Sequence, residues 1–173
     1  QAVSAFDLYI APFVKSDNIR FKELKQILQG MLFELNYPAR AGYQSPFTNV
    51  TLMLDTSKDI LRGNAYLGGK IIGQLGDFVD EAIEVNKALF ELYIEGDAVG
   101  QPFTFPIPTL MLTKRFDWNG RRWGDLTDLI FKALAKRGTA YLLNGYASNV
   151  EALYAMCCRL TLDTSKLNGN GFK

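Results

Sequence analysis

Hydrophobic residues recur at helical spacing in four stretches of the chain. Residues 3–14, 20–36, 77–95 and 124–137 carry apolar side chains at intervals of three or four positions, the spacing that places them on one helix face. This pattern predicts four helices. In 77–95 the apolar positions cover much of the helix circumference, so this helix is expected to be buried on two sides, against a sheet and against a partner subunit.

Shorter apolar stretches favour strands. Residues 46–55 alternate in strand fashion, and three prolines precede a second candidate strand over 109–113. Further strands are expected at 139–143 and at Leu160–Leu162. Because strands alternate with helices, the sequence predicts an α/β fold, either a layer or a barrel, with partly parallel strands.

Turn-forming residues occupy two of the remaining stretches. Residues 56–75 contain four glycines and predict a loop. The Gly68-Gly69 pair beside Lys70 lacks the GxxxxGK[ST] spacing of a phosphate-binding loop, so an ordinary loop is favoured. Residues 144–148 predict another loop, after which Asn149 is expected to cap a short helical turn.

Composition excludes several classes of protein. The 173 residues are 48% hydrophobic and 21% charged, which suits one globular domain. The net charge of +1 provides no basic excess for binding nucleic acid. No apolar run approaches the ~20 residues of a membrane span, and the first residues lack the basic start of a signal peptide. We therefore expect a protein that binds neither membrane nor nucleic acid. Two adjacent cysteines do not make an extracellular disulfide framework, so a cytoplasmic location is expected. Residue 1 is not Met and residues 168–173 resemble a loop that leads to another element, so the chain is expected to be a piece of a longer polypeptide.

The best candidates for chemistry are the two cysteines, Cys157 and Cys158. The chain contains no histidine, which excludes imidazole catalysis and histidine-ligated metals. Zinc would need about four ligands at CxxC-like spacing, so no metal site is expected. A disulfide between adjacent residues is strained and uncommon. Buried structural cysteines, a redox sensor and a catalytic sulfur all remain open.

Five motifs follow one another along the chain. They are Ala11–Phe13 (APF), Ser45–Asn49 (SPFTN), Glu95–Thr109 with its PFTFPIPT run, Phe116–Trp118 (FDW) and Met156–Leu160 (MCCRL). Together and in this order they resemble the anaerobic, glycyl-radical class of ribonucleoside-triphosphate reductases, which make deoxynucleotides. The similarity extends through essentially the whole chain.

The resemblance implies a fold and a place within it. The family fold is a ten-stranded α/β barrel built from two five-stranded halves, and residues 1–173 correspond to a single segment, about half, of this catalytic barrel domain. The N-terminal ATP-binding cone, the C-terminal glycyl-radical loop, the four-cysteine zinc site and the early barrel cysteine have no counterpart in the sequence. The segment is therefore expected to be inactive alone.

The resemblance also implies a reaction. A cysteine on a loop inside the barrel becomes a thiyl radical, which abstracts the 3′ hydrogen of the ribonucleotide. The 2′ hydroxyl leaves as water, and formate or a thiol supplies electrons. We expect Cys158 to be the thiyl and Cys157 to pack beside it or assist. An S–H bond is close in strength to the ribose C–H bond, so hydrogen can move in both directions.

Two further residues are candidates for binding substrate. Asn144 lies in Leu143–Ser148, which resembles the family's SNFxNS stretch, where the asparagine would bind ribose hydroxyls or formate. A polar turn residue is an equal alternative, and the residues before Asn144 depart from the family's PYF. Arg159 would neutralise substrate phosphate; the alternatives are that its stem packs on apolar surface while its charge reaches water, or that it pairs with a carboxylate.

For the complete enzyme the resemblance implies further components. These are a glycyl radical on a separate loop, a formate or thiol reductant, zinc, ATP and dNTP effectors and a radical-SAM activating enzyme. A homodimer is expected, with helices 20–36 and 77–95 helping to form the dimer and the specificity-effector site. Two other functions stay open: a glycyl-radical enzyme of the pyruvate formate-lyase type, and a non-catalytic half-barrel that binds a nucleotide or a partner.

Overall fold

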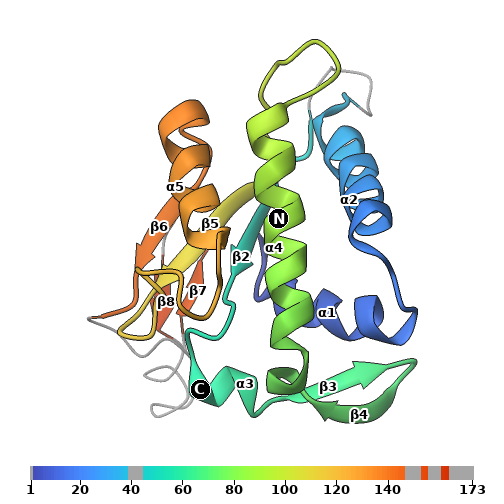
Figure 1. The fold of residues 1–173 in the computed structure, drawn as a ribbon, viewed down its shortest axis with the longest axis vertical. Helices are drawn as coiled ribbons and strands as arrows, with labels where there is room; N and C mark the ends of the chain where they lie inside the picture. The colour runs from blue at the N-terminus through green and yellow to red at the C-terminus, as the bar shows by residue number, and fades with distance from the viewer. Residues whose placement is uncertain (1, 39–44, 147–152, 156–160, 164–173) are drawn as a thin grey trace, which may run out of the picture.

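A computed structural model describes residues 2–38, 45–146, 153–155 and 161–163 of the chain (Figure 1). The helices are α1 (Phe6–Ser16), α2 (Phe21–Asn36), α3 (Lys58–Leu61), α4 (Val79–Glu95) and α5 (Leu126–Arg137), with a 3-10 helix η1 (Leu75–Phe78). The strands are β1 (Ala2–Val3), β2 (Asn49–Leu52), β3 (Asn64–Leu67), β4 (Lys70–Gln74), β5 (Ile107–Leu112), β6 (Tyr141–Asn144), β7 (Leu153–Ala155) and β8 (Thr161–Asp163).

A parallel sheet with the strand order β1-β2-β5-β6 forms the centre of the described structure. In Figure 1, α4 and α5 lie across one face of this sheet and α2 lies beside α4. Chain segments containing helices connect β2 to β5 and β5 to β6, as parallel neighbours require. The predicted α/β fold class with parallel strands is confirmed.

The main hydrophobic core lies between the sheet and the helices. Val50, Leu52 and Leu110 point from β2 and β5 into a cluster with Leu89 and Tyr93 of α4. Helix α4 is buried over much of its length because α1, α2 and α5 of the same chain pack around it. Its broad apolar surface is thus covered without a partner subunit.

Helix α2, by contrast, is buried on one face only. Leu24, Leu28 and Leu32 face the core. Phe33 and Tyr37 are 57% and 59% exposed, and their rings stack at a centroid distance of 5.9 Å. Helix α2 and the residue after it therefore expose an apolar surface.

The motifs SPFTN and PFTFPIPT lie side by side at the start of β2 and β5. The Ile107 amide donates to the Thr48 carbonyl at 2.8 Å, and Asn49 Nδ2 donates to Thr109 Oγ1 at 3.2 Å. Asn36, at the end of α2, accepts hydrogen bonds from the Thr104 and Phe105 amides. These contacts fix the proline-rich segment, and they give Asn49 a structural role.

The prediction of a loop over residues 56–75 is wrong. This segment forms α3, the antiparallel hairpin β3–β4 and the start of η1. Gly68 and Gly69, with φ angles of +55° and +78°, make the turn between the two strands. Such positive angles favour glycine, so the Gly-Gly pair serves hairpin geometry here.

The chain ends show smaller differences. The first helix was expected from residue 3, but Ala2 and Val3 pair with β2, and α1 begins at Phe6. Strand β8 forms close to the predicted Leu160–Leu162, and it pairs antiparallel with β7, which was not predicted. The turn expected at Asn149 lies outside the described residues. Among the described helices, none has the length and apolar character needed to cross a bilayer.

Candidate functional site

The candidate site lies where the parallel strands end. Because β2, β5 and β6 run in the same direction, their carboxyl ends meet at one edge of the sheet. Asp55 follows β2, Thr113 and Arg115 follow β5, and Asn144 ends β6. Open α/β sheets bind their ligands at this edge, so the polar residues there are the first candidates for function.

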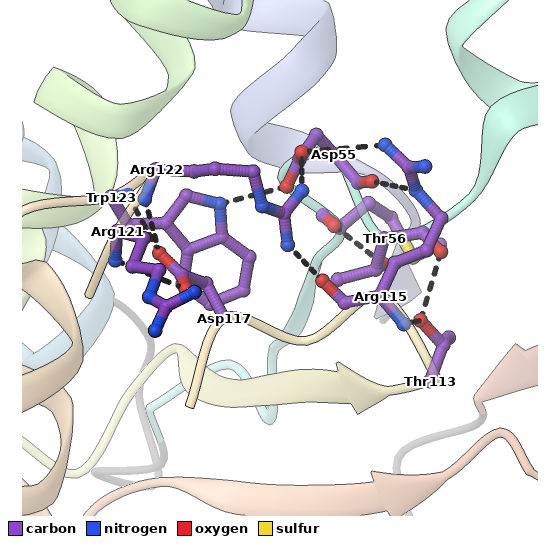
Figure 2. A network of polar contacts seen from close by, with 9 residues as sticks. Asp55, Thr56, Thr113, Arg115, Asp117, Arg121, Arg122 and Trp123 are labelled. Atoms are coloured by element: carbon purple, nitrogen blue, oxygen red, sulfur yellow. Dashed lines mark hydrogen bonds and ion pairs between the residues drawn. The ribbon is translucent and has the colours of Figure 1, made fainter. Parts of the chain in front are cut away.

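Asp55 is the centre of a polar network at this edge (Figure 2). Its Oδ1 accepts a hydrogen bond from Trp123 Nε1 at 2.7 Å, and its Oδ2 accepts one from Arg122 Nη1. Arg115 Nε donates to the Asp55 carbonyl at 2.9 Å, and Arg115 Nη2 lies 3.5 Å from Oδ2. One carboxylate therefore holds two guanidinium groups and an indole.

Burial differs sharply within this network. The Asp55 side chain is 12% exposed, whereas the side chains of Arg115 and Arg122 are 37% and 39% exposed. The Asp55 carboxylate is thus nearly buried, whereas the two arginine side chains are partly exposed to solvent. The ion pairs are partly desolvated, so they are screened less by salt than fully exposed pairs.

Backbone contacts join the loops that follow β2 and β5. Thr113 Oγ1 donates to the Thr56 carbonyl at 2.9 Å and accepts from the Arg115 amide at 3.1 Å. Arg122 Nη2 donates to the Arg115 carbonyl. These bonds position the Arg115 backbone and side chain together, so the network is preorganised.

Asp117 of the FDW motif organises the turn that carries Arg122. Its carboxylate accepts hydrogen bonds from the amides of Arg121, Arg122 and Trp123 at 3.1, 2.7 and 2.9 Å. Burial acts to raise the pKa of Asp117, but the backbone N–H donors outweigh it and lower the pKa below its ordinary value. The lowered pKa keeps the Asp117 carboxylate ionised.

A second buried carboxylate holds the end of β2 from the other side. Asp7 of α1 is fully buried and accepts hydrogen bonds from the amides of Met53 and Leu54 at 3.0 and 2.7 Å. Asn86 Nδ2 of α4 donates to Asp7 at 2.9 Å. Burial raises the pKa of Asp7 despite these donors. Leu54 has a φ of +49°, so Asp7 secures an unusual backbone conformation directly before Asp55.

The predicted cysteines lie outside the described residues. In the sequence, Cys157, Cys158 and Arg159 follow β7 and precede β8. Asn144 is described: its Oδ1 accepts a hydrogen bond from the Tyr146 amide at 3.0 Å, which forms an Asx turn. It shares the carboxyl edge of the sheet with the Asp55 network. The roles proposed for these four residues stay predictions.

Sequence reasoning missed Asp7, Asp55, Arg115 and Arg122. The available signals were two dibasic pairs, at 114–115 and 121–122, that flank the FDW turn, and an aspartate just past a strand. Their pairing joins residues far apart in the chain and could not be read from spacing. In the part of the chain that the structure describes, no group of three or more acidic or cysteine side chains could hold a metal ion.

Comparisons with known proteins agree with the motifs. The family model described as anaerobic ribonucleoside-triphosphate reductase matches residues 1–172. The crystal structure of the anaerobic ribonucleotide reductase from Thermotoga maritima with citrate in the active site is 26% identical, with a TM-score of 0.63. The likeness covers 87% of this chain and 27% of that one.

A second structure, of the Thermotoga maritima enzyme with dATP bound in the specificity site, is 24% identical with a TM-score of 0.59. The match covers 87% of this chain and 26% of the Thermotoga maritima chain. At this level of identity it supports the similarity of fold and nothing further. No curated protein matches the sequence. The chain thus spans about a quarter of the length of the solved reductases, in keeping with a partial barrel.

Proposed function

Because the chain belongs to the anaerobic ribonucleoside-triphosphate reductase family, we propose that it is a segment of the catalytic barrel of an enzyme that reduces ribonucleoside triphosphates to deoxyribonucleoside triphosphates. The observation that carries this proposal is the family match, which extends over residues 1–172. The MCCRL motif lies inside that match and supplies the sulfur that the reaction needs.

Cys158 is the proposed thiyl residue. It takes the hydrogen atom from C3′ of the ribose, so an S–H bond forms as the C–H bond breaks. The 2′ hydroxyl then leaves as water after taking up a proton. Formate or a thiol supplies the two electrons and the remaining hydrogen, and Cys158 returns its hydrogen atom to C3′. The thiyl itself forms when the Cys158 S–H bond breaks, and a glycyl radical outside this segment would take up that hydrogen atom.

Two other residues are proposed to bind the substrate. Asn144 lies at the carboxyl edge of the sheet, where its amide nitrogen can donate to a ribose hydroxyl or to formate while Oδ1 keeps its bond to the Tyr146 amide. Arg159, next to Cys158 in sequence, is proposed to neutralise a substrate phosphate. Cys157 is proposed to pack beside the thiyl.

Product analysis of the complete protein tests the function. After activation by a radical-SAM enzyme without oxygen, it is expected to convert a ribonucleoside triphosphate to the deoxyribonucleotide in the presence of formate or a thiol. A pyruvate formate-lyase type of enzyme would instead release formate from pyruvate and coenzyme A. Nucleotide binding without any turnover by the activated protein would favour the binding-module alternative.

We further propose that the complete enzyme is a homodimer regulated by ATP and dNTP effectors, with a zinc site outside this segment. The exposed rings of Phe33 and Tyr37 on α2 support an interface there. Introducing a charge with Phe33→Glu is expected to shift the complete protein from dimer toward monomer. Sedimentation velocity of both proteins measures this shift, and an unchanged dimer would place the interface elsewhere.

A further inference from the structure

Positive charge concentrates around Asp55 and the segment 113–124. This segment carries four cationic side chains, Lys114, Arg115, Arg121 and Arg122, against the carboxylates of Asp117 and Asp55. The local net charge is therefore +2, although the whole chain carries only +1. The excess lies at one edge of the sheet, so it creates a local positive potential on an otherwise balanced protein.

The carboxylates of this cluster do not neutralise its cations. Asp117 is occupied by three backbone amides, and Asp55 is shared between two arginines. Within the described ranges, no carboxylate lies at ion-pair distance from Lys114 or Arg121. Asp55 therefore fixes the arginine pair in place and leaves one positive charge of that pair uncompensated.

The arginine pair also keeps donors available. Arg115 uses Nε and Nη2 to contact Asp55, and Arg122 uses Nη1 and Nη2 within the network. Among the described residues, nothing accepts a hydrogen bond from Arg115 Nη1 or Arg122 Nε. Both side chains are more than one third exposed to solvent, so the guanidinium groups have donors left for an incoming anion.

We propose that Arg115 and Arg122, held together by Asp55, bind the phosphate groups of a nucleotide. Guanidinium groups match phosphate oxygens in geometry and charge. Asp55, Thr113 and Trp123 position the pair before a ligand arrives, which lowers the entropy cost of binding. The position at the carboxyl ends of parallel strands is the usual place for a ligand in such a sheet. Naming a nucleotide as the source of the phosphate rests on the proposed function, whereas the anion site does not.

Calorimetric titration of inorganic tripolyphosphate into the complete protein tests the anion site without any turnover. Arg115→Gln is expected to weaken binding about tenfold, the loss of one charge-assisted contact. Arg115→Lys, which keeps the charge but loses the planar fork, is expected to show a smaller loss. Arg62→Gln is the matched control, because Arg62 is an exposed arginine directly after α3 and pairs with Asp59, which takes no part in the Asp55 network. Its affinity for tripolyphosphate should match that of the unmodified protein.

Nucleotide kinetics then identify the source of the phosphate. A raised KM for the ribonucleotide in Arg115→Gln, with kcat retained, assigns the site to the substrate. A raised half-saturating concentration of the effector, with KM retained, assigns it to the effector. Equal tripolyphosphate affinity in Arg115→Gln, Arg115→Lys and the unmodified protein, all with the same melting temperature, would overturn the proposal. If the protein lacks reductase activity, the tripolyphosphate titration still decides the anion site.

Discussion

Replacing Cys158 by serine is expected to abolish deoxynucleotide formation by the complete enzyme while the glycyl radical still forms. A serine O–H bond is much stronger than the ribose C–H bond, so a serine cannot accept the radical and then exchange hydrogen with the substrate at comparable energy. The serine side chain is close in size to cysteine, so the fold should tolerate it. Turnover assays measure the loss, and electron paramagnetic resonance measures the glycyl radical in the same sample.

The neighbouring cysteine provides the matched control. Cys157→Ser makes the same chemical change one position away, and partial activity is expected because Cys157 is assigned a packing or assisting role. Full turnover in Cys158→Ser would end its assignment as the thiyl. If Cys157→Ser were inactive and Cys158→Ser active, the two roles would be exchanged. Loss of the glycyl radical itself in either variant would point to a folding defect.

The helices could be predicted from the sequence where a continuous face of the helix is buried. Helices α2, α4 and α5 were predicted within about two residues because their apolar positions repeat at the helical period. Helix α5 ends at Gly138, whose φ of +63° is the left-handed C-cap conformation. These signals are local, so a single sequence contains them.

The hairpin β3–β4 was missed because its apolar pattern differs from that of a buried strand. Tyr66, Ile71 and Ile72 are largely exposed, and a bulge between Ala65 and Tyr66 interrupts the alternation. The Gly68-Gly69 pair is the remaining signal in the sequence, and two adjacent glycines fit an ordinary loop as well as a hairpin turn. Strand β7 was not predicted either. It has only three residues, Leu153–Ala155, and so short a stretch shows no alternation that would indicate a strand. Its pairing with β8 is seen only in the structure.

The candidate site was predictable only where a motif carried it. MCCRL singles out Cys158 through family resemblance. The contact of Asp55 with Arg122 spans 67 positions and that of Asp7 with Asn86 spans 79. No periodicity links such residues, because the sheet and the helices bring them together only after folding. Long-range polar contacts of this kind have to be observed in the structure.

Replacing Asp7 by alanine is expected to loosen the end of β2. The Met53 and Leu54 amides would be buried without an acceptor, while Asn86 would keep its bond to the Ala82 carbonyl. Each buried unsatisfied donor costs about 1–3 kcal/mol, so the expected loss in local stability is about 4 kcal/mol. Hydrogen exchange of the Met53 and Leu54 amides measures it directly. Exchange as slow as in the unmodified protein would show that Asp7 does not hold this strand end.

The pH dependence separates the charge of Asp7 from its role as an acceptor. Burial raises the pKa of Asp7 above its ordinary value of 3.8, because desolvation outweighs the N–H donors. The folded protein then binds the proton more tightly than the unfolded chain. The stability that Asp7 contributes is therefore fully present below the unfolded pKa, and it decreases as the pH rises through the folded pKa. Asp7→Asn cannot ionise, so the stability advantage of the unmodified protein over this variant should shrink as the pH rises above 3.8, the ordinary pKa of the carboxyl group. An advantage that grew with pH would mean that the hydrogen bonds outweigh burial.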